Sequence, residues 1–562
     1  MNTDKIWIRD IAEVCAAKGV QKAVISPGSR SAPLVIAFNR HPAIECIQVI
    51  DERVAAFFAL GIAQQTGNPV ALICTSGSAA LNYAPAIAEA YYQRVPLIIL
   101  TADRPDELIE QRDGQTIRQQ NVYSNYIRKS FHLPVVGEHE DDRWFSARII
   151  SEALNVAVHP VPGPVHVNVP LREPLYNVKE DAEYVQPKVI EQLQPVSTLS
   201  EADKTSLQNE WTKYKSKLLI VGGMFDTGKT SSNLTEAFAK LMRDPSVVAL
   251  TESSSNLPVE GVIPIIDPVL EAMPKNEKAS FTPELLVTIG GEIVSKKIKA
   301  FFRANKPKAH WHIDISGDHV DTYKCLTKVI ALRMPDFLDV IKDAQHQQSD
   351  FRNKWLAVNE EAKKIREDVL KQSPYSDFTV FNELLRSLPD NCNLHLGNST
   401  PIRYANLFEV NPTVTVNCNR GTSGIDGCSS TAAGAAFSNQ ILTTLITGDI
   451  SFLYDSNALW NKHLPKNLRI IILNNSGGNI FRIIPGPSSL NELEEYFETK
   501  QEQTVEHIAK AFSLPYYFCD DMQSLKTQLK DFYKPQEKAA ILEIKTPNET
   551  SAKVLQEYMN MK

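Results

Sequence analysis

Short apolar runs alternate with stretches of helical periodicity along almost the whole chain, and this alternation limits the folds open to it. In the first third, apolar runs break into polar turns marked by Gly or Pro: KAVISPGSR, IECIQVIDER, VALICTSGS and VPLIILTADRP. Stretches such as ERVAAFFALGIAQQTG then follow with apolar residues at helical spacing. Units of strand, loop and helix favour parallel sheets, which present functional side chains at their carboxyl edge.

The pattern predicts an α/β protein of three domains, each with a mainly parallel sheet flanked by helices. A stretch rich in Gln, Pro and Val indicates a linker after the first domain, and a charged helical stretch indicates a solvated connector before the last. The predicted boundaries within the 562 residues are 1–183 for the first domain, 184–200 for the linker, 201–345 for the central domain, 346–375 for the connector and 376–562 for the last domain.

Charge and composition argue against several classes of protein. Lys and Arg number 59 against 66 Asp and Glu, a net charge of −7, which disfavours a protein held to nucleic acid by a general basic field. No apolar run approaches the roughly 18–20 residues that cross a bilayer, and the N-terminus shows no signal-peptide core. The eight cysteines include no CxxC pair, so neither a disulfide framework nor a zinc knuckle is predicted. We expect a cytoplasmic enzyme that acts on small molecules and binds neither nucleic acid nor membranes.

Two polar clusters follow apolar runs in the last third. Gly448-Asp449-Ile450-Ser451 follows ILTTLIT, and Asn474-Asn475-Ser476-Gly477-Gly478 follows LRIIIL. A carboxylate and an amide oxygen at neighbouring strand ends are hard oxygen ligands of the kind that Mg²⁺ prefers. The two glycines allow the backbone to come close enough for a carbonyl to serve as a further ligand. Ordinary loop chemistry after buried strands is the alternative for either cluster alone.

These clusters resemble the signature of the thiamine-diphosphate-dependent enzymes, in which GDG is followed some 25–30 residues later by NN. The resemblance implies thiamine diphosphate and Mg²⁺ or Mn²⁺ as cofactors, with Asp449, Asn475 and the Gly477 carbonyl as metal ligands. Ile450 stands where the signature has Gly, which leaves the metal-binding Asp in place. The implied fold binds the pyrimidine ring in the first domain and the diphosphate in the last. Because the cofactor lies between two subunits in this family, a homo-oligomer is implied, a dimer of dimers.

Glu52, in VIDERVAAFF, occupies the position of the family's second element, a glutamate after the second strand and at the start of a helix. A carboxylate on the aminopyrimidine nitrogen favours the imino tautomer, which removes the proton from thiazolium C2. Desolvation there raises the carboxyl pKa. The alternative role is that of a glutamate favoured at a helix N-terminus by the helix dipole, worth only about 0.3–1 kcal/mol.

Further motifs resemble one branch of the family, which acts in menaquinone biosynthesis: SPGSRSAPL, TADRPDEL, DGQTIRQ, GNSTPIR, NRGTSGIDG and NNSGGNIFRIIP. The resemblance implies decarboxylation of 2-oxoglutarate and 1,4-addition of the resulting succinyl carbanion equivalent to isochorismate. Another 2-oxo-acid carboligase or decarboxylase, similar to acetolactate synthase, is the alternative within the family. Several substrate carboxylates require fixed cations, and Arg suits planar bidentate recognition.

The residues that stand in the matching motifs are the expected site. Catalytic roles are implied for Glu52, Arg30, Arg403 and Arg420. Cofactor contacts are implied for Glu52, Thr75, Gly77, Ser399, Ser423, Gly424, Ile425, Asp449, Ile450, Ser451, Asn475, Gly477, Gly478, Asn479 and Ile480. Substrate contacts are implied for Ser29, Arg30, Arg104, Gln115, Lys296, Lys297, Ser399, Arg403, Arg420, Ile480 and Phe481. Surface solvation is the alternative for the cations, and core packing for the apolar residues.

A different class of function is suggested by residues 223–230, GMFDTGKT, which fit the Walker A pattern after the apolar run KLLIVGG. A nucleotide hydrolase or nucleotide-regulated protein is the rival hypothesis. Against it, TIGG ends a strand without a metal-binding Asp, and Asp314 in IDIS is the only weak candidate. That hypothesis also leaves Glu52 and the Asp449 cluster unexplained. A silent scaffold is disfavoured because it needs neither of them.

Overall fold

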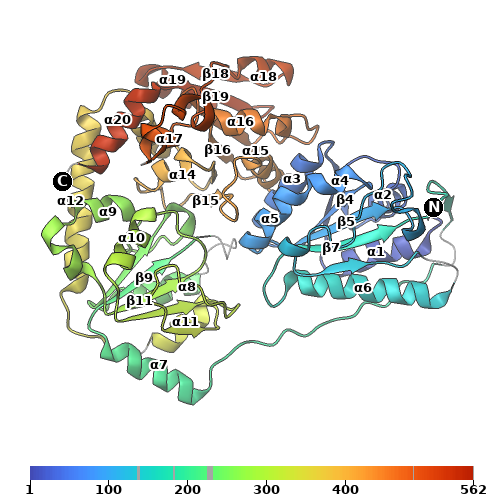
Figure 1. The fold of residues 1–562 in the computed structure, drawn as a ribbon, viewed down its shortest axis with the longest axis horizontal. Helices are drawn as coiled ribbons and strands as arrows, with labels where there is room; N and C mark the ends of the chain where they lie inside the picture. Colours follow the sequence, from blue (N-terminus) through green and yellow to red (C-terminus); the bar gives the residue numbers. More distant parts are fainter. Residues whose placement is uncertain (136–138, 181–183, 224–231, 343, 485, 561–562) are drawn as a thin grey trace.

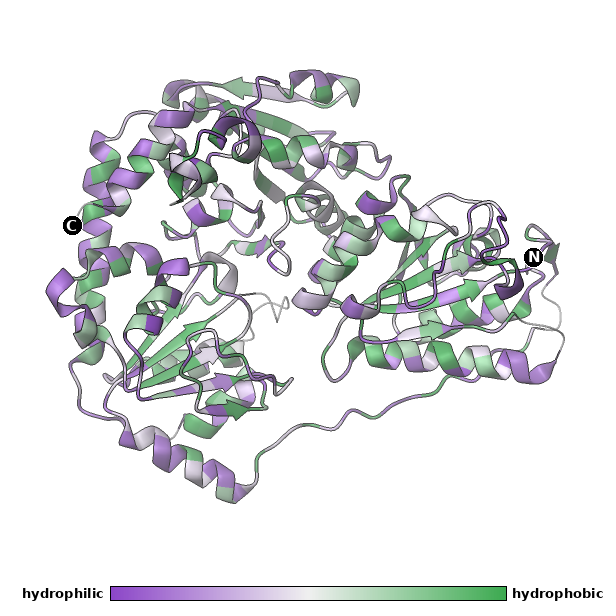
Figure 2. Cartoon of the chain, in the orientation of Figure 1, coloured by the Kyte–Doolittle hydropathy of each residue, from purple (hydrophilic) through white to green (hydrophobic). Residues whose placement is uncertain are grey.

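The computed structural model describes residues 1–135, 139–180, 184–223, 232–342, 344–484 and 486–560. In Figure 1 the chain forms an N-terminal part in blue, a middle part in green and a C-terminal part in orange and red. Each part contains a parallel sheet with helices on both faces, which confirms the predicted fold class. Figure 2 shows the strands mainly in hydrophobic green, while the outer faces of the helices are mixed with hydrophilic purple, as sheets buried on both sides require.

The N-terminal sheet has the strand order β3-β2-β4-β5-β7-β6. Its strands are β2 (Lys22–Ile25), β3 (Glu45–Gln48), β4 (Val70–Cys74), β5 (Leu97–Asp103), β6 (Ser130–His132) and β7 (Val165–Pro170). One face packs against α1 (Ile6–Ala17), α2 (Ala32–Asn39) and α6 (Glu140–Val158), and the other against α3 (Glu52–Thr66), α4 (Ser78–Asn82) and α5 (Ala84–Gln93). Alternate residues of each strand enter the two cores, as pleated strands dictate. A separate antiparallel pair joins β1 (Asn2–Thr3) to β8 (Val178–Lys179).

The C-terminal sheet repeats this topology, because its order β15-β14-β16-β17-β19-β18 matches the N-terminal order strand for strand. Its strands are β14 (Asn393–Leu396), β15 (Thr415–Cys418), β16 (Thr443–Gly448), β17 (Leu468–Asn474), β18 (Tyr516–Cys519) and β19 (Ala540–Lys545). One face packs against α13 (Asp377–Arg386), α14 (Thr400–Ala405), α17 (Ile480–Ile483), α19 (Met522–Phe532) and α20 (Asn548–Met559), and the other against α15 (Cys428–Ser438), α16 (Asp449–Tyr454) and α18 (Glu506–Ala511). In both sheets the second strand is added on one side of the first and the later strands on the other side. A switch of strand order at this point leaves a ligand crevice at the carboxyl edge.

The middle sheet has the order β10-β9-β11-β12-β13. Its strands are β9 (Lys217–Val221), β10 (Val247–Thr251), β11 (Leu285–Ile289), β12 (Ala309–Ile313) and β13 (Lys328–Ile330). One face packs against α7 (Glu201–Lys213), α8 (Ser232–Leu241) and α11 (Met334–Ile341), and the other against α9 (Ile266–Ala272), α10 (Lys296–Ala304) and α12 (Phe351–Gln372).

The segments between the sheets differ from each other in burial. Residues 184–200 carry neither helix nor strand and cross the lower edge of Figure 1 before α7. The expected solvated connector is wrong in one respect, because α12 buries one face that includes Trp355 and Ala362. It packs against α9, and Arg366 donates to the Leu407 carbonyl at 3.0 Å. Its many charged residues concealed an apolar stripe at helical spacing.

The N- and C-terminal sheets share one hydrophobic core, which α3 and α15 build between them. The two helices touch through small residues: a Cβ at Gly61 would overlap the backbone of Thr431, and a Cβ at Gly434 would overlap the backbone of Phe58. This close approach fixes the two repeated domains against each other within one chain. No helix in the described ranges is both long and apolar enough to cross a membrane.

Candidate active site

The loops that leave β2 and β4 form the first half of the site, at the crevice of the N-terminal sheet. Gly28 lies against Thr75, because a Cβ at Gly28 would overlap the Thr75 side chain. Thr75 and Gly77 are buried at the end of β4, whereas Ser29 is exposed on the facing loop. The structure thus brings together three of the residues expected to contact ligands: Ser29, Thr75 and Gly77.

Arg30 and Arg104 form a pair of like charges beside this crevice. Arg30 donates to the Leu171 carbonyl at 3.1 Å and lies 3.4 Å from Glu173, and Arg104 donates to Ser76 Oγ at 2.5 Å. Burial lowers the pKa of the Arg30 guanidinium, and the charge of Arg104 lowers it further. An anion bound between the two side chains would relieve this repulsion.

Gln115 reaches the same crevice through its backbone. A Cβ at Gly77 would lie 3.3 Å from the Gln115 carbonyl oxygen, and Gln115 has a positive φ of 60°. The Gly77 N–H donates to the buried Gln119 side chain at 2.8 Å. Gln119 is the last residue of the motif DGQTIRQ but was not among the expected site residues, because the motif alone does not distinguish a buried glutamine from a solvated one.

Glu52 is the first residue of α3, and Asp51 caps the helix by accepting from the Val54 N–H at 3.2 Å. Burial raises the pKa of the Glu52 carboxyl group, the direction that desolvation of a carboxylate predicts. Within the described part of the chain, no hydrogen bond or ion pair joins the Glu52 side chain to another residue; only its own backbone N–H lowers the pKa against the effect of burial, so the carboxylate is available to a ligand. Its neighbours are fixed to the C-terminal domain: Asn457 donates to Asp51 at 2.8 Å, and Arg53 lies 2.8 Å from Asp455.

The second half of the site lies at the carboxyl edge of the C-terminal sheet. Asp449 follows β16 directly and is 1% exposed. Burial raises the pKa of its carboxyl group to about 6, against the effects of a Gln501 hydrogen bond and the Gly477 N–H. Gln501 donates to Asp449 Oδ2 at 2.6 Å. Ile450 is compatible with this geometry because it lies in helical backbone, where a side chain is allowed.

Asn475 follows β17, the strand beside β16 in the sheet. Its Nδ2 donates to the buried Asp377 carboxylate at 2.9 Å, which orients the amide, while its Oδ1 is buried and has no hydrogen-bond partner. A buried oxygen without a partner is costly unless a ligand satisfies it. The donors available here are therefore a desolvated carboxylate and an orphaned amide oxygen, and oxygen donors of this kind fit Mg²⁺ or Mn²⁺.

No group of three His, Cys, Asp or Glu side chains that could hold a metal occurs among the described residues. Gly477 contributes backbone rather than side chain, with a φ of 146° and close contact to Glu498. Beside it, the Gly478 N–H donates to the Glu498 carbonyl at 2.6 Å, and Asn479 Nδ2 donates to the Asn548 carbonyl at 3.1 Å. These bonds fix the turn that leads into α17, which begins with Ile480 and Phe481.

The loop 419–427 connects β15 to α15 and carries Ser423, Gly424 and Ile425. Asn398 holds its first residue and its middle by donating to the Asn419 carbonyl at 2.6 Å and to the Gly424 carbonyl at 2.7 Å. Ser451 Oγ donates to the Ile425 carbonyl at 2.9 Å, which joins the loop to the start of α16. The expected cofactor residues 423–425 and 449–451 are therefore neighbours in space.

Arg403 and Arg420 form a second pair of like charges, on α14 and at the start of this loop. Arg403 donates to the Ser399 carbonyl at 2.7 Å, and within the described ranges it makes no ion pair. Arg420 lies 3.3 Å from Glu292. Burial lowers the pKa of Arg403 and the charge of Arg420 lowers it further, so this pair also favours a bound anion.

Lys296 and Lys297 begin α10 of the middle domain. Lys296 is exposed, whereas Lys297 forms an ion pair with Glu271. The charges of both Lys297 and Arg403 act to lower the pKa of the buried Asp267 carboxyl group, against the larger effect of burial. The start of α10 therefore lies near Arg403 of the C-terminal domain, whereas Arg30 and Arg104 form a separate group in the N-terminal domain.

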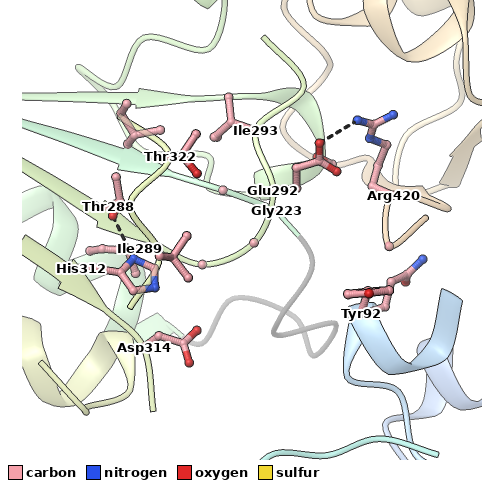
Figure 3. A pocket seen from close by; sticks show the side chains of 18 of the residues that line it. Tyr92, Gly223, Thr288, Ile289, Glu292, Ile293, His312, Asp314, Thr322 and Arg420 are labelled. Atoms are coloured by element: carbon pink, nitrogen blue, oxygen red, sulfur yellow. Dashed lines mark hydrogen bonds and ion pairs between the residues drawn. The ribbon is translucent and has the colours of Figure 1, made fainter. Parts of the chain in front are cut away.

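A cavity of about 360 Å³ lies on the other side of Arg420. Figure 3 shows the strand ends of the middle sheet on one side of it and Tyr92 of α5 on the other, with Arg420 turned toward Glu292. Gly223 lines this cavity, while residues 224–230 of the Walker-like segment lie outside the described residues. Asp314, the weak candidate for a metal-binding Asp, is paired with Arg94 at 2.9 Å.

Comparison with known protein families assigns the chain to a class of enzymes. The family described as "Thiamine pyrophosphate enzyme, N-terminal TPP binding domain" matches residues 8–123, and the "Middle domain of thiamine pyrophosphate" matches residues 188–396. The protein is thus a thiamine-diphosphate-dependent enzyme.

Curated relatives narrow this class. Proteins named 2-succinyl-5-enolpyruvyl-6-hydroxy-3-cyclohexene-1-carboxylate synthase are 43% identical in Flavobacterium johnsoniae, with 98% of each chain covered, and 42% identical in Christiangramia forsetii, with 98% of each chain covered. The synthase of Bacteroides thetaiotaomicron is 37% identical, with 99% of each chain covered. The chain belongs to this family of synthases.

Proposed function

We propose that this protein decarboxylates 2-oxoglutarate and adds the resulting succinyl carbanion equivalent to isochorismate, giving 2-succinyl-5-enolpyruvyl-6-hydroxy-3-cyclohexene-1-carboxylate and CO₂ in menaquinone biosynthesis. The observation that carries the substrate assignment is the pair Arg403 and Arg420. Both guanidiniums are half-buried, the charge of Arg420 lowers the pKa of Arg403, and Arg403 has no ion pair in the described ranges, so an anion bound beside Arg403 would be stabilised. The carboxylates of these two substrates provide it bidentately.

The cofactor is held by two domains in this proposal. Residues 1–183 bind its pyrimidine ring and residues 376–562 its diphosphate, with Asp449, Asn475 and the Gly477 carbonyl on Mg²⁺ or Mn²⁺. Thiamine diphosphate supplies a carbanion nucleophile when it is bound. Glu52 holds a proton at the aminopyrimidine nitrogen, and its partial burial and lack of protein partners suit that role. Ile425 supports the cofactor, and Ile480 and Phe481 exclude water from the reacting carbon.

Substrate carboxylates are bound by the cations of all three domains. Arg30 and Arg104 act from the N-terminal domain, with Ser29 and Gln115 as polar partners. Lys296 and Lys297 act from the middle domain, and Arg403 and Arg420 act from the C-terminal domain beside Ser399. Each charge-assisted hydrogen bond contributes about 1.5–3 kcal/mol to binding.

We further propose that the active enzyme is a homo-oligomer, a dimer of dimers, in which Glu52 of one subunit serves the metal site of another. The proposed compartment is the cytoplasm. All eight cysteines are free and six of them are buried, which suits a reducing compartment.

The decisive experiment mixes the protein with thiamine diphosphate, Mg²⁺, 2-oxoglutarate and isochorismate. Loss of the isochorismate absorbance, with release of CO₂ and a product of the coupled mass, is the expected result. Pyruvate in place of 2-oxoglutarate is the control, because it lacks the distal carboxylate that the arginines bind. Turnover of pyruvate with no turnover of 2-oxoglutarate would instead indicate a carboligase similar to acetolactate synthase.

A further inference from the structure

Glu89 is a buried carboxylate of the N-terminal domain that binds a loop of the C-terminal domain. It lies on α5 and is 1% exposed. Its Oε1 accepts from the Gly421 N–H at 2.6 Å, and its Oε2 accepts from the Thr422 N–H at 2.7 Å and from Thr422 Oγ1 at 2.6 Å. One side chain thus receives three hydrogen bonds from two consecutive residues of another domain.

The hydrogen bonds to this carboxylate all come from neutral groups. Gln93 donates to Glu89 from the same helix, and Gln64 of α3 donates to Gln93 at 2.7 Å. Among the described residues no cation lies within ion-pair distance of Glu89. Removing a carboxylate from water in this way is unfavourable unless the hydrogen bonds to it are well formed. The bonds to residues 421 and 422 are therefore the main compensation for burying it.

Gly421 is shaped for this contact. A Cβ there would lie 2.6 Å from the Glu89 carbonyl oxygen and 3.1 Å from Tyr92 Cβ, so only glycine lets the loop approach α5. Figure 3 shows Tyr92 on this helix beside the loop that carries Arg420. The loop thus contacts α5 in two ways: it donates hydrogen bonds to the Glu89 side chain, and the backbone of Gly421 packs closely against the helix.

The residues that Glu89 binds lie between Arg420 and Ser423. Ser423 has a positive φ of 63°, a conformation that a serine adopts only when its surroundings hold it. Asn398 holds the loop at Asn419 and Gly424, and Glu89 holds the two residues 421 and 422 between them. The conformation of the loop is thus determined by bonds from two domains.

We propose that Glu89 is a positioning residue for catalysis, which fixes the loop so that Arg420 faces substrate and residues 423–425 face the cofactor. This inference rests on the proposed function. Glu89 touches neither substrate nor cofactor in it, and acts through the loop. Groups held in place before binding lose less entropy when the ligand arrives, so loosening the loop weakens binding without removing any contact residue.

The test compares Glu89→Gln with wild type as full-length enzymes. Hydrogen exchange of the cofactor-free proteins reports the loop directly: amides in a peptide covering 419–427 are expected to exchange about tenfold or more faster in the variant, while peptides of α12 stay unchanged. In the loaded enzymes, the KM for isochorismate and the thiamine diphosphate concentration for half-maximal activity are expected to rise about tenfold, with a smaller change in kcat.

One further pair of variants and one control make the test specific. Thr422→Val removes one donor to Glu89 and should reproduce part of the effect, whereas Thr422→Ser keeps the hydroxyl and should restore it. Glu152→Gln is the matched control, because Glu152 is a partly exposed carboxylate on α6 whose ion pairs, with Lys129 and Arg148, lie within the N-terminal domain. If Glu89→Gln does not fold, the same exchange and kinetic measurements on Thr422→Val and Thr422→Ser test the positioning role.

Unchanged exchange of 419–427, or faster exchange spread evenly over the chain, would overturn the positioning role. So would an unchanged KM and cofactor requirement. A wild-type enzyme that turns over neither substrate would contradict the proposed function instead, because the exchange measurement needs no substrate.

Discussion

At the scale of single residues, the Glu52 carboxylate has the clearest expected effect on chemistry. Glu52→Gln keeps the size of the side chain but cannot hold a proton as a carboxylate does, so kcat is expected to fall by about 10²–10⁴-fold. The thermal unfolding midpoint should stay near the wild-type value, because no other residue depends on this side chain for a hydrogen bond.

Glu45→Gln is the matched control for Glu52, since Glu45 is a largely exposed carboxylate on the edge strand β3. It should retain wild-type kcat. Near-normal turnover by Glu52→Gln would remove the assigned role of this residue.

The metal site gives a second prediction for single residues. Asp449→Ala removes the charged member of the oxygen donor set, so the Mg²⁺ concentration that supports half-maximal activity should rise by about 10- to 100-fold or more. Titration of cofactor binding with Mg²⁺, followed by intrinsic fluorescence, measures this without turnover. Asp531→Ala, at an exposed pair with Lys534, is the control. An unchanged titration would contradict the metal assignment.

Site residues could be predicted from the sequence where they stand in a recognisable motif. Their hydrogen-bond partners, which are far from them in the sequence, could not. Asp449, Asn475 and Glu52 follow strands in recognisable strings, and their partners do not. Gln501 and Asp377 orient Asp449 and Asn475 from 52 and 98 positions away. Nothing in the sequence around them distinguishes a buried hydrogen-bonding side chain from a solvated one.

At the scale of elements, the contact between α3 and α15 depends on two glycines. Alanine is a better helix former than glycine by about 1 kcal/mol, so Gly61→Ala would stabilise α3 in isolation. In the protein its Cβ meets the backbone of Thr431, and forcing the helices apart should cost about 1–3 kcal/mol. We therefore expect a lower thermal midpoint for Gly61→Ala.

Gly114→Ala is the control for this prediction, because a Cβ at Gly114 meets no atom within 4 Å. It should leave the midpoint at or slightly above the wild-type value. A Gly61→Ala protein more stable than wild type would show that helix propensity outweighs packing at this contact.

A pH dependence is expected where β10 meets α10. Glu252 follows β10 and accepts from the Val294 and Ser295 N–H groups at 2.7 and 2.8 Å, facing Asp267, Arg420, Arg403 and Tyr323. Burial raises its pKa from 4.5 to about 7. A raised folded-state pKa gives stability that is present below pH 4.5 and is lost as the pH rises to about 7.

Glu252→Gln removes this titration. The free energy of unfolding of the variant relative to wild type should therefore increase by about 3 kcal/mol between pH 4.5 and 8, whatever constant difference the lost acceptor adds. Denaturant unfolding at several pH values measures it. A difference that does not change with pH would show that the folded-state pKa of Glu252 is ordinary.

Among the elements, long apolar strands could be predicted, as could the short edge strand β3 in IECIQVIDER, but three other short edge strands could not. β6, β13 and β18 lie at sheet edges and have three or four residues each, with partly exposed side chains in β18. Their hydrophobic pattern is too short to separate them from loops. The buried stripe of α12 was hidden for the opposite reason, because charged residues outnumber apolar ones along a helix that packs on one side only.

At the scale of the whole molecule, the repeated topology of the two outer domains has a consequence for the active site. Within one chain, α3 and α15 join these domains through a common core, and Asp51 and Arg53 are tied to the C-terminal domain. Glu52, between them, has no partner among the described residues. In the homo-oligomer proposed above, a second copy of the chain brings the metal-binding edge of its own C-terminal domain to this carboxylate.

Mixing two inactive variants tests whether the site is shared. If each site takes Glu52 from one subunit and Asp449 from its partner, a dimer of one Glu52→Gln chain and one Asp449→Ala chain contains one site with both residues changed and one site with both intact. Random reassembly makes half of the dimers mixed, so activity should recover to about a quarter of that of wild type. Each variant reassembled alone is the control and should stay inactive. No recovery, in a mixture shown by mass to contain mixed dimers, would mean that each site is built from a single chain.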